Sequence, residues 1–565
     1  MKWDCLGTYM VVWTLQLVPS ALRYPLGLES WVVLPLGVFA LVFRRDWGAA
    51  CAAHLAFVVA KCMRQPDQYN SDIWMGWLDF VVVLVGSAAA RGRKRKDAAI
   101  YGAAPTARIC LGLLYLSAGV FKANSSHLSV RTSCSSLFVA TLVSSYAPFF
   151  SDATKEALAS VAVKYAGHVT VVVESSVGLL LLQPKKFPQK MGAFLGLLLH
   201  LGIASSPKPN NIVAFSTMAP ARYIFVCLES ATVVMLEHGR KDGLALFVGL
   251  IALTWKRYDA AYAAFAAVII IIFAALLQTK DDDLLARVTS SRTSKSLDEP
   301  EEDVQKKNCL LTCARSFVIG VTLVYGFLLV PLGLKDQGNT HMFANLRIMG
   351  GSNHLFLPTG LLQKKFAHRR GPGPFDGGVV RVDRSNNPRL NGTYPFELSQ
   401  VLPVKARALA RAVGHSGREF IPLESRIHGP ELFGEYNRTE DAVTYATHAF
   451  ELRRLLFDAQ HTKRETDFYL DYTALPSLPD GATDWLQALT YHNNTVRFSV
   501  DHDGRATCVY LETGANCDPQ EPVLQPWPPT GLPRFFTQIL LKILVFNPYP
   551  LIPGEDHSEM VCCDG

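Results

Sequence analysis

The sequence lacks the short motifs that identify the common enzyme classes. It contains no GxSxG nucleophile elbow, no phosphate-binding P-loop, no HExxH zinc motif and no dinucleotide-binding fingerprint. Internal repeats, which would favour a transporter, are also lacking. Charged residues make up only 18% of the 565 residues, and no basic stripe interleaved with aromatic residues indicates nucleic-acid binding. We therefore expect no nucleic-acid partner.

The N-terminus also lacks the features of a cleaved signal peptide. Lys2 is followed by a mixed stretch that contains Trp3, Asp4 and Cys5, without a compact apolar core or a small-residue cleavage site. The first apolar helix is therefore expected to remain as a membrane anchor.

Hydrophobic residues are abundant, at 49% of the chain. This content is too high for an ordinary soluble protein and too low for a pure membrane bundle, so we expect one part of each kind. The pattern predicts a polytopic α-helical membrane domain over residues 1–278 and an additional transmembrane helix at 309–333. The apolar segments fall at about 6–20, 28–43, 48–63, 72–89, 98–121, 157–182, 190–206, 211–236, 243–255, 259–278 and 309–333.

Short basic loops set the expected orientation, and they carry much of the net charge of +7. If the apolar segments alternate across the bilayer, most of these loops fall on one side, which the positive-inside rule makes cytosolic. Residues 279–308, which are rich in Ser, Asp, Glu and Lys, are then a flexible cytosolic linker. The basic loops are Arg44-Arg45, Arg91–Lys96, Lys185-Lys186 with Lys190, and Arg240-Lys241, with Lys256-Arg257 as the exception.

Residues 334–565 are expected to form a mostly β, disulfide-permissive luminal domain. Its β-branched, alternating runs indicate strands, and Ala406–Val413 and Glu451–Asp458 indicate helices. Phe535–Phe546 is an apolar segment too short to span, which suits either an amphipathic helix on the membrane or a docking helix in the soluble core. The strand runs are Gly378–Val382, Val443–Phe450, Thr495–Val500 and Thr507–Leu511.

Glycosylation sequons and cysteines favour a secretory compartment for this domain. Asn391, Asn437 and Asn493 each begin an Asn-X-Thr sequon. Cys508 and Cys517 flank a short turn and are candidates for a disulfide bond. We therefore expect a multi-pass glycoprotein of the endoplasmic reticulum or a later secretory membrane. The loop after Lys122 agrees with a luminal side, because it contains an Asn124-Ser-Ser sequon and Cys134.

Leu111–Asn124 is the segment on which a functional interpretation depends. It is an apolar helix that runs directly into Lys122. A lysine inside lipid is costly unless it reaches the interface or finds a partner, so Lys122 is either an anchor that extends to the interface or a working amine.

The segment Tyr115–Lys122 resembles the stretch that bears the active-site lysine of vitamin K-dependent gamma-glutamyl carboxylase, in the membrane domain shared with the HTTM proteins. Glu174–Leu182, Gly192–His200 and Asn211–Arg222 are similar, in the same order, to later helices of that superfamily. The resemblance covers roughly residues 60–235.

The resemblance implies a lyase that uses vitamin K hydroquinone or another quinone as its cofactor. Lys122 would deprotonate the hydroquinone, since removal from water favours a lysine's free amine, and the oxygenated quinone would then take a proton from a substrate glutamate. His200 and Glu174 are the candidates for orienting Lys122. A histidine that only bonds a neighbouring helix is the alternative for His200, and an ion pair with Arg108, Lys164 or Arg222 is the alternative for Glu174.

Two further stretches carry unusual polar residues. Asp72, Trp74, Trp77 and Asp79 crowd one helix, and we interpret the tryptophans as membrane-interface anchors. His341–Pro358 contains a double glycine followed by Asn353 and His354, which suits either a lid over the pocket or a plain turn.

Two functions of other classes remain open at this point. One is a non-enzymatic membrane scaffold or folding factor whose luminal domain binds a secreted protein client. The other is a proton-coupled transporter that uses Lys122, His200 and Glu174. The lipid bilayer is the partner common to all three functions.

Overall fold

The structure is a computed structural model, and it describes most of the N-terminal half and selected parts of the C-terminal half. The described residues are 4–23, 27–44, 46–64, 70–91, 97–146, 151–205, 213–238, 257–277, 301–331, 344–346, 353–358, 379–386, 395–397, 404–416, 419–422, 445–453, 468–474, 495–501, 505–517, 549–550 and 562–563. The predicted sequons Asn391, Asn437 and Asn493 and the segment Phe535–Phe546 lie outside these residues.

The chain divides into two compact units. The first unit comprises Met1–Arg64, Ser71–Ser117 and Val172–Val324, and the second comprises Gln65–Asn70, Ala118–Val171 and Tyr325–Gly565. This division differs from the expected boundary near residue 334, because Ala118–Val171 groups with the C-terminal region. The contacts that cause this are hydrogen bonds and a small apolar core, described below.

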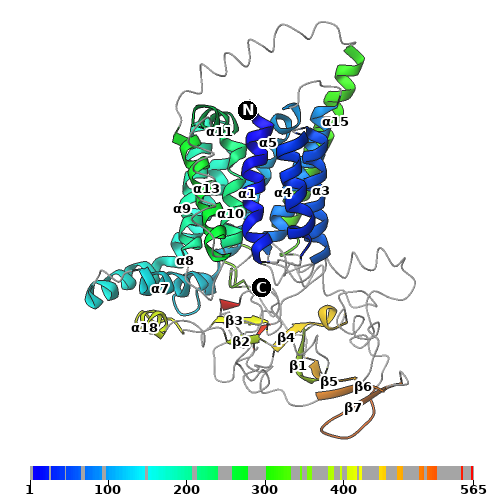
Figure 1. Ribbon diagram of the computed structural model, residues 1–565. Helices are drawn as coiled ribbons and strands as arrows, with labels where there is room; N and C mark the ends of the chain where they lie inside the picture. Colours follow the sequence, from blue (N-terminus) through cyan, green and yellow to red (C-terminus); the bar gives the residue numbers. More distant parts are fainter. Residues whose placement is uncertain are drawn as a thin grey trace. The chain divides into compact units, whose positions relative to one another are not determined.

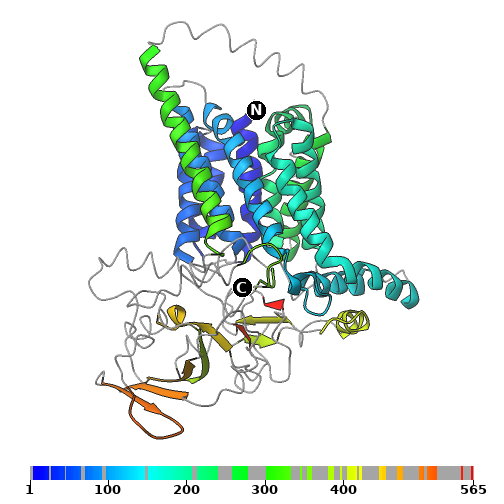
Figure 2. The same cartoon turned by 180° about the vertical axis from the view of Figure 1, so that it is seen from behind.

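The first unit is helical, and its helices run side by side in Figures 1 and 2. Among the residues that the structure describes, five helices are long and apolar enough to cross a membrane. They cover Cys5–Leu22, Asp72–Ala90, Ala98–Lys122, Ala153–Leu182 and Cys309–Leu328. The helices that lie in or enter the first unit are α1 (Cys5–Arg23), α2 (Leu34–Phe39), α3 (Trp47–Arg64), α4 (Asn70–Ala90), α5 (Ala98–Lys122), α8 (Asp152–Leu182), α9 (Lys186–Ala204), α10 (Val213–Ala221), α11 (Ile224–His238), α13 (Arg257–Leu277) and α15 (Glu301–Leu323), with π-helical turns η1 (Glu29–Val33), η2 (Ala40–Arg44) and η3 (Val324–Leu328).

Two details of this unit bear on the sequence analysis. Helix α15 begins at Glu301, inside the segment expected to be a linker up to residue 308, and the rest of that segment lies outside the described residues. Helices α5 and α8 approach closely at Gly112 and Gly178, where a Cβ on Gly178 would lie 2.5 Å from the backbone nitrogen of Leu116. Small residues allow two helices to approach this closely, a feature that is common where helices pack in membranes.

The second unit contains a six-stranded antiparallel sheet in the order β7-β6-β5-β1-β4-β8 and a three-stranded sheet in the order β2-β3-β9. Its described core gathers alternate residues of the larger sheet, including Val380, Tyr445, Tyr472 and Phe498. The strands are β1 (Val379–Ser385), β2 (Pro395–Glu397), β3 (Glu419–Pro422), β4 (Tyr445–His448), β5 (Phe468–Ala474), β6 (Thr495–Val500), β7 (Ala506–Tyr510), β8 (Tyr549–Pro550) and β9 (Cys562–Cys563).

The sequence runs predicted β1, β4, β6 and β7 within a few residues, and β6 with the same ends. They left out β5, which lies between β6 and β1 in the sheet, and also β2, β3, β8 and β9. The predicted helix Ala406–Val413 is found as α18 (Val404–Ala412), whereas the predicted helix from Glu451 is described only as far as residue 453.

The second unit also includes helices from the middle of the chain. Helix α7 (Cys134–Tyr146) buries Leu137 and Ala140 against the first half of α8 and against Ala410 of α18. The short helix α6 (Ser125–Leu128) precedes it. Because α7 is part of this core, the described packing assigns it to the second unit and not to the helical bundle.

Candidate functional site

A buried tyrosine–histidine pair lies inside the first unit. The Tyr115 hydroxyl of α5 and the His200 Nε2 of α9 are 2.5 Å apart, and both side chains are shielded from solvent. Helical spacing explains the position of His200, because Gly192, Gly196 and His200 are four residues apart, share one face of α9 and are all buried. The pair is therefore a polar point in apolar surroundings.

Aromatic rings surround this pair. The Tyr223 ring stacks on Tyr115 with centroids 6.2 Å apart, Trp74 meets Tyr115 edge-on at 6.3 Å, and Phe215 meets His200 edge-on at 4.9 Å. Gly196 makes room for Tyr223, since a Cβ at Gly196 would lie 1.8 Å from the Tyr223 hydroxyl. We name Tyr115, His200, Tyr223, Trp74 and Phe215 the aromatic cluster.

The aromatic cluster retains hydrogen-bonding capacity. Among the described residues, the His200 Nδ1 nitrogen has no hydrogen-bond partner although the residue is fully buried. A neutral imidazole has one donor nitrogen and one acceptor nitrogen, so whichever role Nε2 takes toward Tyr115, the other role remains at Nδ1. A buried polar atom of this kind is costly unless a ligand or water satisfies it.

Glu174 lies near the aromatic cluster. It is half-buried on α8, and its carboxylate interacts electrostatically with Tyr115 and Tyr223. Two of the partners considered for it bond elsewhere. Arg108 donates to the carbonyls of Leu181 and Gln183, and Arg222 pairs with Asp79.

Lys122, the third predicted catalytic residue, is the last residue of α5 and belongs to the second unit. Its side chain is buried, at 4% exposure. The three residues therefore divide between the units, with His200 and Glu174 in the first and Lys122 in the second. Their roles in catalysis stay predictions.

The sequence did not predict the buried ion pair between Arg222 and Asp79 in the first unit. Arg222 Nη2 lies 2.8 Å from Asp79 Oδ1, and both side chains are at most 1% exposed. Trp13 Nε1 donates to Asp79 Oδ2 at 3.1 Å, His54 Nδ1 lies 3.3 Å from Asp79 Oδ1, and Arg222 also donates to Gln16. Asp79 is thus surrounded by polar groups from α1, α3 and the residues between α10 and α11.

A second buried cluster joins Lys61 of α3 to two carboxylates. Lys61 Nζ lies 2.6 Å from Asp72 Oδ1 and 3.3 Å from Glu29 Oε1.

The interpretation of Trp74 as an interface anchor is wrong, because Trp74 is 3% exposed and packs on Tyr115. The sequence signal for both clusters was the presence of Asp72 and Asp79 within one predicted span. Carboxylates inside a helical bundle normally pair with a cationic side chain of another helix.

The His341–Pro358 stretch supports the plain-turn alternative where it is described. Asn353 donates to Ser126 Oγ at 2.8 Å and to the Asn345 carbonyl at 2.8 Å. His354 Nε2 donates to the Val120 carbonyl at 2.8 Å, and its Nδ1 accepts from two backbone N–H groups. Burial lowers the pKa of His354, which favours the neutral imidazole that these hydrogen bonds require. Both residues therefore hold this stretch in place through hydrogen bonds to neighbouring segments.

Asn124 begins a sequon but is unsuited to carry a glycan in the folded chain. It is fully buried and is the N-cap of α6, accepting from the backbone nitrogen of His127 at 2.8 Å. Its amide donates to the carbonyls of Phe121 and Ala344 at 2.9 and 2.5 Å. These bonds tie residues 121–127 to the C-terminal region and explain part of the unit boundary.

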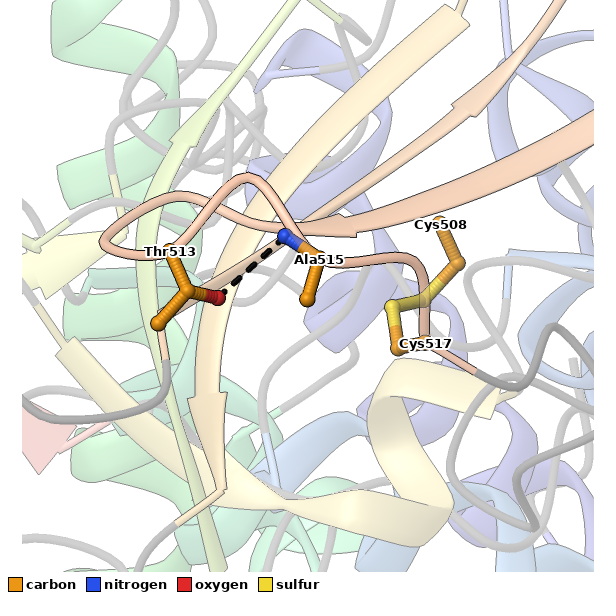
Figure 3. The surroundings of a disulfide bond; sticks show 4 residues. All are labelled: Cys508, Thr513, Ala515 and Cys517. Atoms are coloured by element: carbon orange, nitrogen blue, oxygen red, sulfur yellow. Dashed lines mark hydrogen bonds between the residues drawn. A yellow bond between two sulfur atoms is a disulfide. The ribbon is translucent and has the colours of Figure 1, made fainter.

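Disulfide bonds occur among the described cysteines only in the second unit. Cys508 and Cys517 are bonded across the turn that follows β7, with a Cα–Cα distance of 5.2 Å, and Figure 3 shows the bond beside the hydrogen bond from Ala515 N to Thr513 Oγ1. Cys134 is also disulfide-bonded. The reduced thiols described are Cys5, Cys51, Cys62, Cys110, Cys227, Cys309 and Cys313, all in the first unit.

No group of three or more His, Cys, Asp or Glu side chains within the described ranges is arranged to hold a metal ion.

Comparison with known proteins yields one match. No curated protein and no solved structure matches the chain significantly. Residues 352–534, which include most of the described strands of the second unit, match a family described as a domain of unknown function, DUF8388.

Proposed function

We propose that this chain is a multi-pass membrane protein of the secretory pathway, with the first unit in the bilayer and the C-terminal part of the second unit in the lumen. Support comes from the five helices long and apolar enough to cross a membrane. Disulfide bonds form in oxidising compartments, and those described lie in the second unit.

Glycan mapping on sealed microsomes tests this orientation. We expect glycosidase to increase gel mobility through Asn391, Asn437 and Asn493, and we expect Asn124 to remain unmodified because its side chain is buried. Protease added to the cytosolic side should leave the C-terminal region intact. Unmodified sequons together with cleavage of that region would refute the orientation.

The proposed activity is that of a quinone-dependent, carboxylase-like enzyme that oxidises a hydroquinone in the aromatic cluster. One observation carries this proposal: the hydrogen bond between Tyr115 and His200 joins two segments that separately resemble the carboxylase, Tyr115–Lys122 and Gly192–His200. Sequence similarity alone does not require residues 85 positions apart to meet.

The residues of the aromatic cluster fit a hydroquinone. Stacked and edge-on rings suit a flat aromatic head, and His200 Nδ1 offers a buried hydrogen bond to a ring hydroxyl or carbonyl. The hydroquinone supplies the electrons that reduce oxygen. Tyr115 and His200 would orient its head within the first unit and exclude water. The assignment of proton removal to Lys122 rests on the sequence resemblance alone.

Oxygen-dependent conversion of vitamin K hydroquinone to its epoxide by purified protein tests the activity. We expect His200→Gln to raise KM up to about tenfold, because it removes the hydrogen bond offered by Nδ1, worth up to roughly 1.5 kcal/mol. Tyr115→Phe should raise KM by a smaller factor, because it removes the hydrogen bond that orients His200. Tyr165→Phe and His168→Gln are matched controls, because both residues are exposed on α8. Lys122→Ala should abolish turnover, and Lys122→Arg should do so too because arginine keeps its proton near neutral pH.

The outcomes separate the parts of this proposal. Absence of turnover by a monodisperse wild type removes the carboxylase-like activity. Turnover that Lys122→Ala leaves unchanged removes Lys122 as the base. Equal KM values for wild type, Tyr115→Phe and His200→Gln remove the aromatic cluster as the hydroquinone site.

A proton-coupled transporter is the second candidate function, and the cluster around Lys61 favours it. Two buried carboxylates, Glu29 and Asp72, share one ammonium group within the helices. Acidic residues in such positions mark proton pathways in transporters. Proton uptake into proteoliposomes that Asp72→Asn abolishes would favour this candidate, with the exposed Glu156→Gln as the control.

A further inference from the structure

Two cysteines lie together in α15, at the start of its apolar span and apart from the aromatic cluster and the ion pairs. Cys309 and Cys313 are reduced and exposed, and their spacing of four residues places them on one face of the helix. Cys309 is also the first residue of the candidate membrane span Cys309–Leu328. The two thiols therefore occupy the first turns of a span.

The surface around these thiols is apolar and continues along the helix. Phe317 is 56% exposed, Val324 is 46% exposed and Leu328 is 49% exposed, and only 22% of the span is buried inside the protein. In the proposed membrane orientation this face of α15 meets lipid, and Lys306 and Lys307 come just before the thiols on the cytosolic side.

Other roles for the two thiols fit the structure less well. Both are reduced, so they do not form a disulfide bond in the described state. They are not part of any described group of three metal-ligating side chains. They are also too exposed to be packing residues of the core. Cysteines beside a membrane span are the usual acceptors of fatty acyl chains.

We propose that Cys309 and Cys313 are S-acylated with long-chain fatty acids at the cytosolic face. Each cysteine thiol gives up its proton, and its sulfur attacks the carbonyl carbon of a long-chain acyl-coenzyme A thioester that is delivered by a membrane acyltransferase. The cysteine sulfur–acyl bond forms, the coenzyme A sulfur–acyl bond breaks, and coenzyme A leaves with the proton of the cysteine. No electron is transferred. The inference rests on the orientation given under Proposed function.

Acyl exchange on the full chain, expressed in eukaryotic cells, tests the inference. Unmodified thiols are blocked with N-ethylmaleimide, thioesters are cleaved with hydroxylamine, and the released thiols are tagged with a polyethylene-glycol maleimide. We expect two hydroxylamine-dependent mass shifts in the wild type. Cys309→Ser and Cys313→Ser should each retain one shift, and the double variant should retain none.

Cys62 provides the matched control. It is a reduced, exposed thiol near the opposite end of a helix, two residues before the end of α3. In the proposed orientation α3 leaves the cytosol after Arg44-Arg45, so Cys62 lies at the luminal end. Cys62→Ser should leave both mass shifts in place.

Two results would overturn the inference, and glycan mapping of the same sample tells them apart. Wild-type protein with glycosylated luminal sequons but without hydroxylamine-dependent tags removes the acylation and leaves the orientation intact. Tags that persist in the Cys309→Ser/Cys313→Ser variant and disappear in Cys62→Ser place acylation at the other end of the helices. That result, with unmodified sequons, removes the orientation as well.

Discussion

The two units of this chain satisfy their buried polar side chains in different ways. In the first unit, charges pair with charges: Arg222 with Asp79, and Lys61 with Asp72 and Glu29. In the second unit, the described ion pairs Arg381–Asp383 and Arg497–Asp471 each have one partner that reaches solvent, at 23% and 46% exposure. Its buried neutral amides and imidazoles bond mainly to backbone groups, as in Asn124, Asn353, His354 and His415.

The difference arises from the number of backbone N–H and C=O groups that remain free to bond a side chain. Helices use nearly all of their own N–H and C=O groups internally, so a charged side chain buried within a helical bundle usually pairs with a charged side chain of another helix. The second unit is built from short helices, strands and connecting turns, whose carbonyls need partners. Asn124, which bonds the carbonyls of Phe121 and Ala344, supplies such partners.

Breaking the Asp79–Arg222 pair should have the largest effect. Asp79→Asn leaves a buried guanidinium without its counter-charge and should cost roughly 3–5 kcal/mol of stability. Thermal unfolding of the detergent-solubilised protein measures the loss. Glu229→Gln is the control, because the Lys186–Glu229 pair is partly open to solvent, at 56% and 30% exposure, and is expected to contribute less than about 1 kcal/mol.

Removal of both charges sharpens this test. The Asp79→Leu/Arg222→Met variant should recover part of the stability, since replacing a buried ion pair by apolar side chains is often neutral. If Asp79→Asn is as stable as Glu229→Gln, the first unit does not depend on paired charges and the comparison between the units fails.

The disulfide bond should give the next largest effect, confined to the second unit. Replacing Cys508 and Cys517 by serine frees a loop with a sequence separation of 9, which should cost about 2–3 kcal/mol. Cys110→Ser in the first unit is the control, because Cys110 is a buried, reduced thiol. Limited proteolysis of the C-terminal region should accelerate in the double variant alone, and equal rates in both would contradict the prediction.

Acid should weaken the second unit by a smaller amount. Burial lowers the pKa of His415 to about 4, against a small opposing effect of its hydrogen bond to the Ser133 carbonyl. Because the unfolded histidine, with a pKa of about 6.5, binds a proton more readily than the folded one, stability falls as the pH falls from about 6.5 towards 4. The loss between pH 7 and pH 5 should be about 2 kcal/mol.

His415→Gln isolates this contribution, since a glutamine amide can still donate to the Ser133 carbonyl but does not titrate. Its thermal midpoint should change less between pH 7 and pH 5 than that of the wild type. His168→Gln, at an exposed position on α8, should follow the wild type. Parallel pH profiles for wild type and His415→Gln would show that His415 is not responsible.

Local sequence patterns determined the elements of this protein. Apolar runs predicted the long helices, because the length and spacing of apolar residues can be read directly along the sequence. Alternation predicted Thr495–Val500 with the ends of β6, and the short spacing of Cys508 and Cys517 indicated a bond that the structure forms. Strand β5 was left out, although pairing with β1 and β6 places it inside the sheet.

The tertiary structure alone decided which residues meet. Asp79 and Arg222 are 143 positions apart, and Tyr115 and His200 are 85 apart, so no local pattern records either pair. Asn124 is a case in which a local pattern gave the wrong indication. Its sequon matches a glycan acceptor, whereas the fold buries its side chain and bonds it to the Ala344 carbonyl. Local propensity acts over a few residues, but a buried polar atom is satisfied by whichever partner the fold brings within about 3 Å.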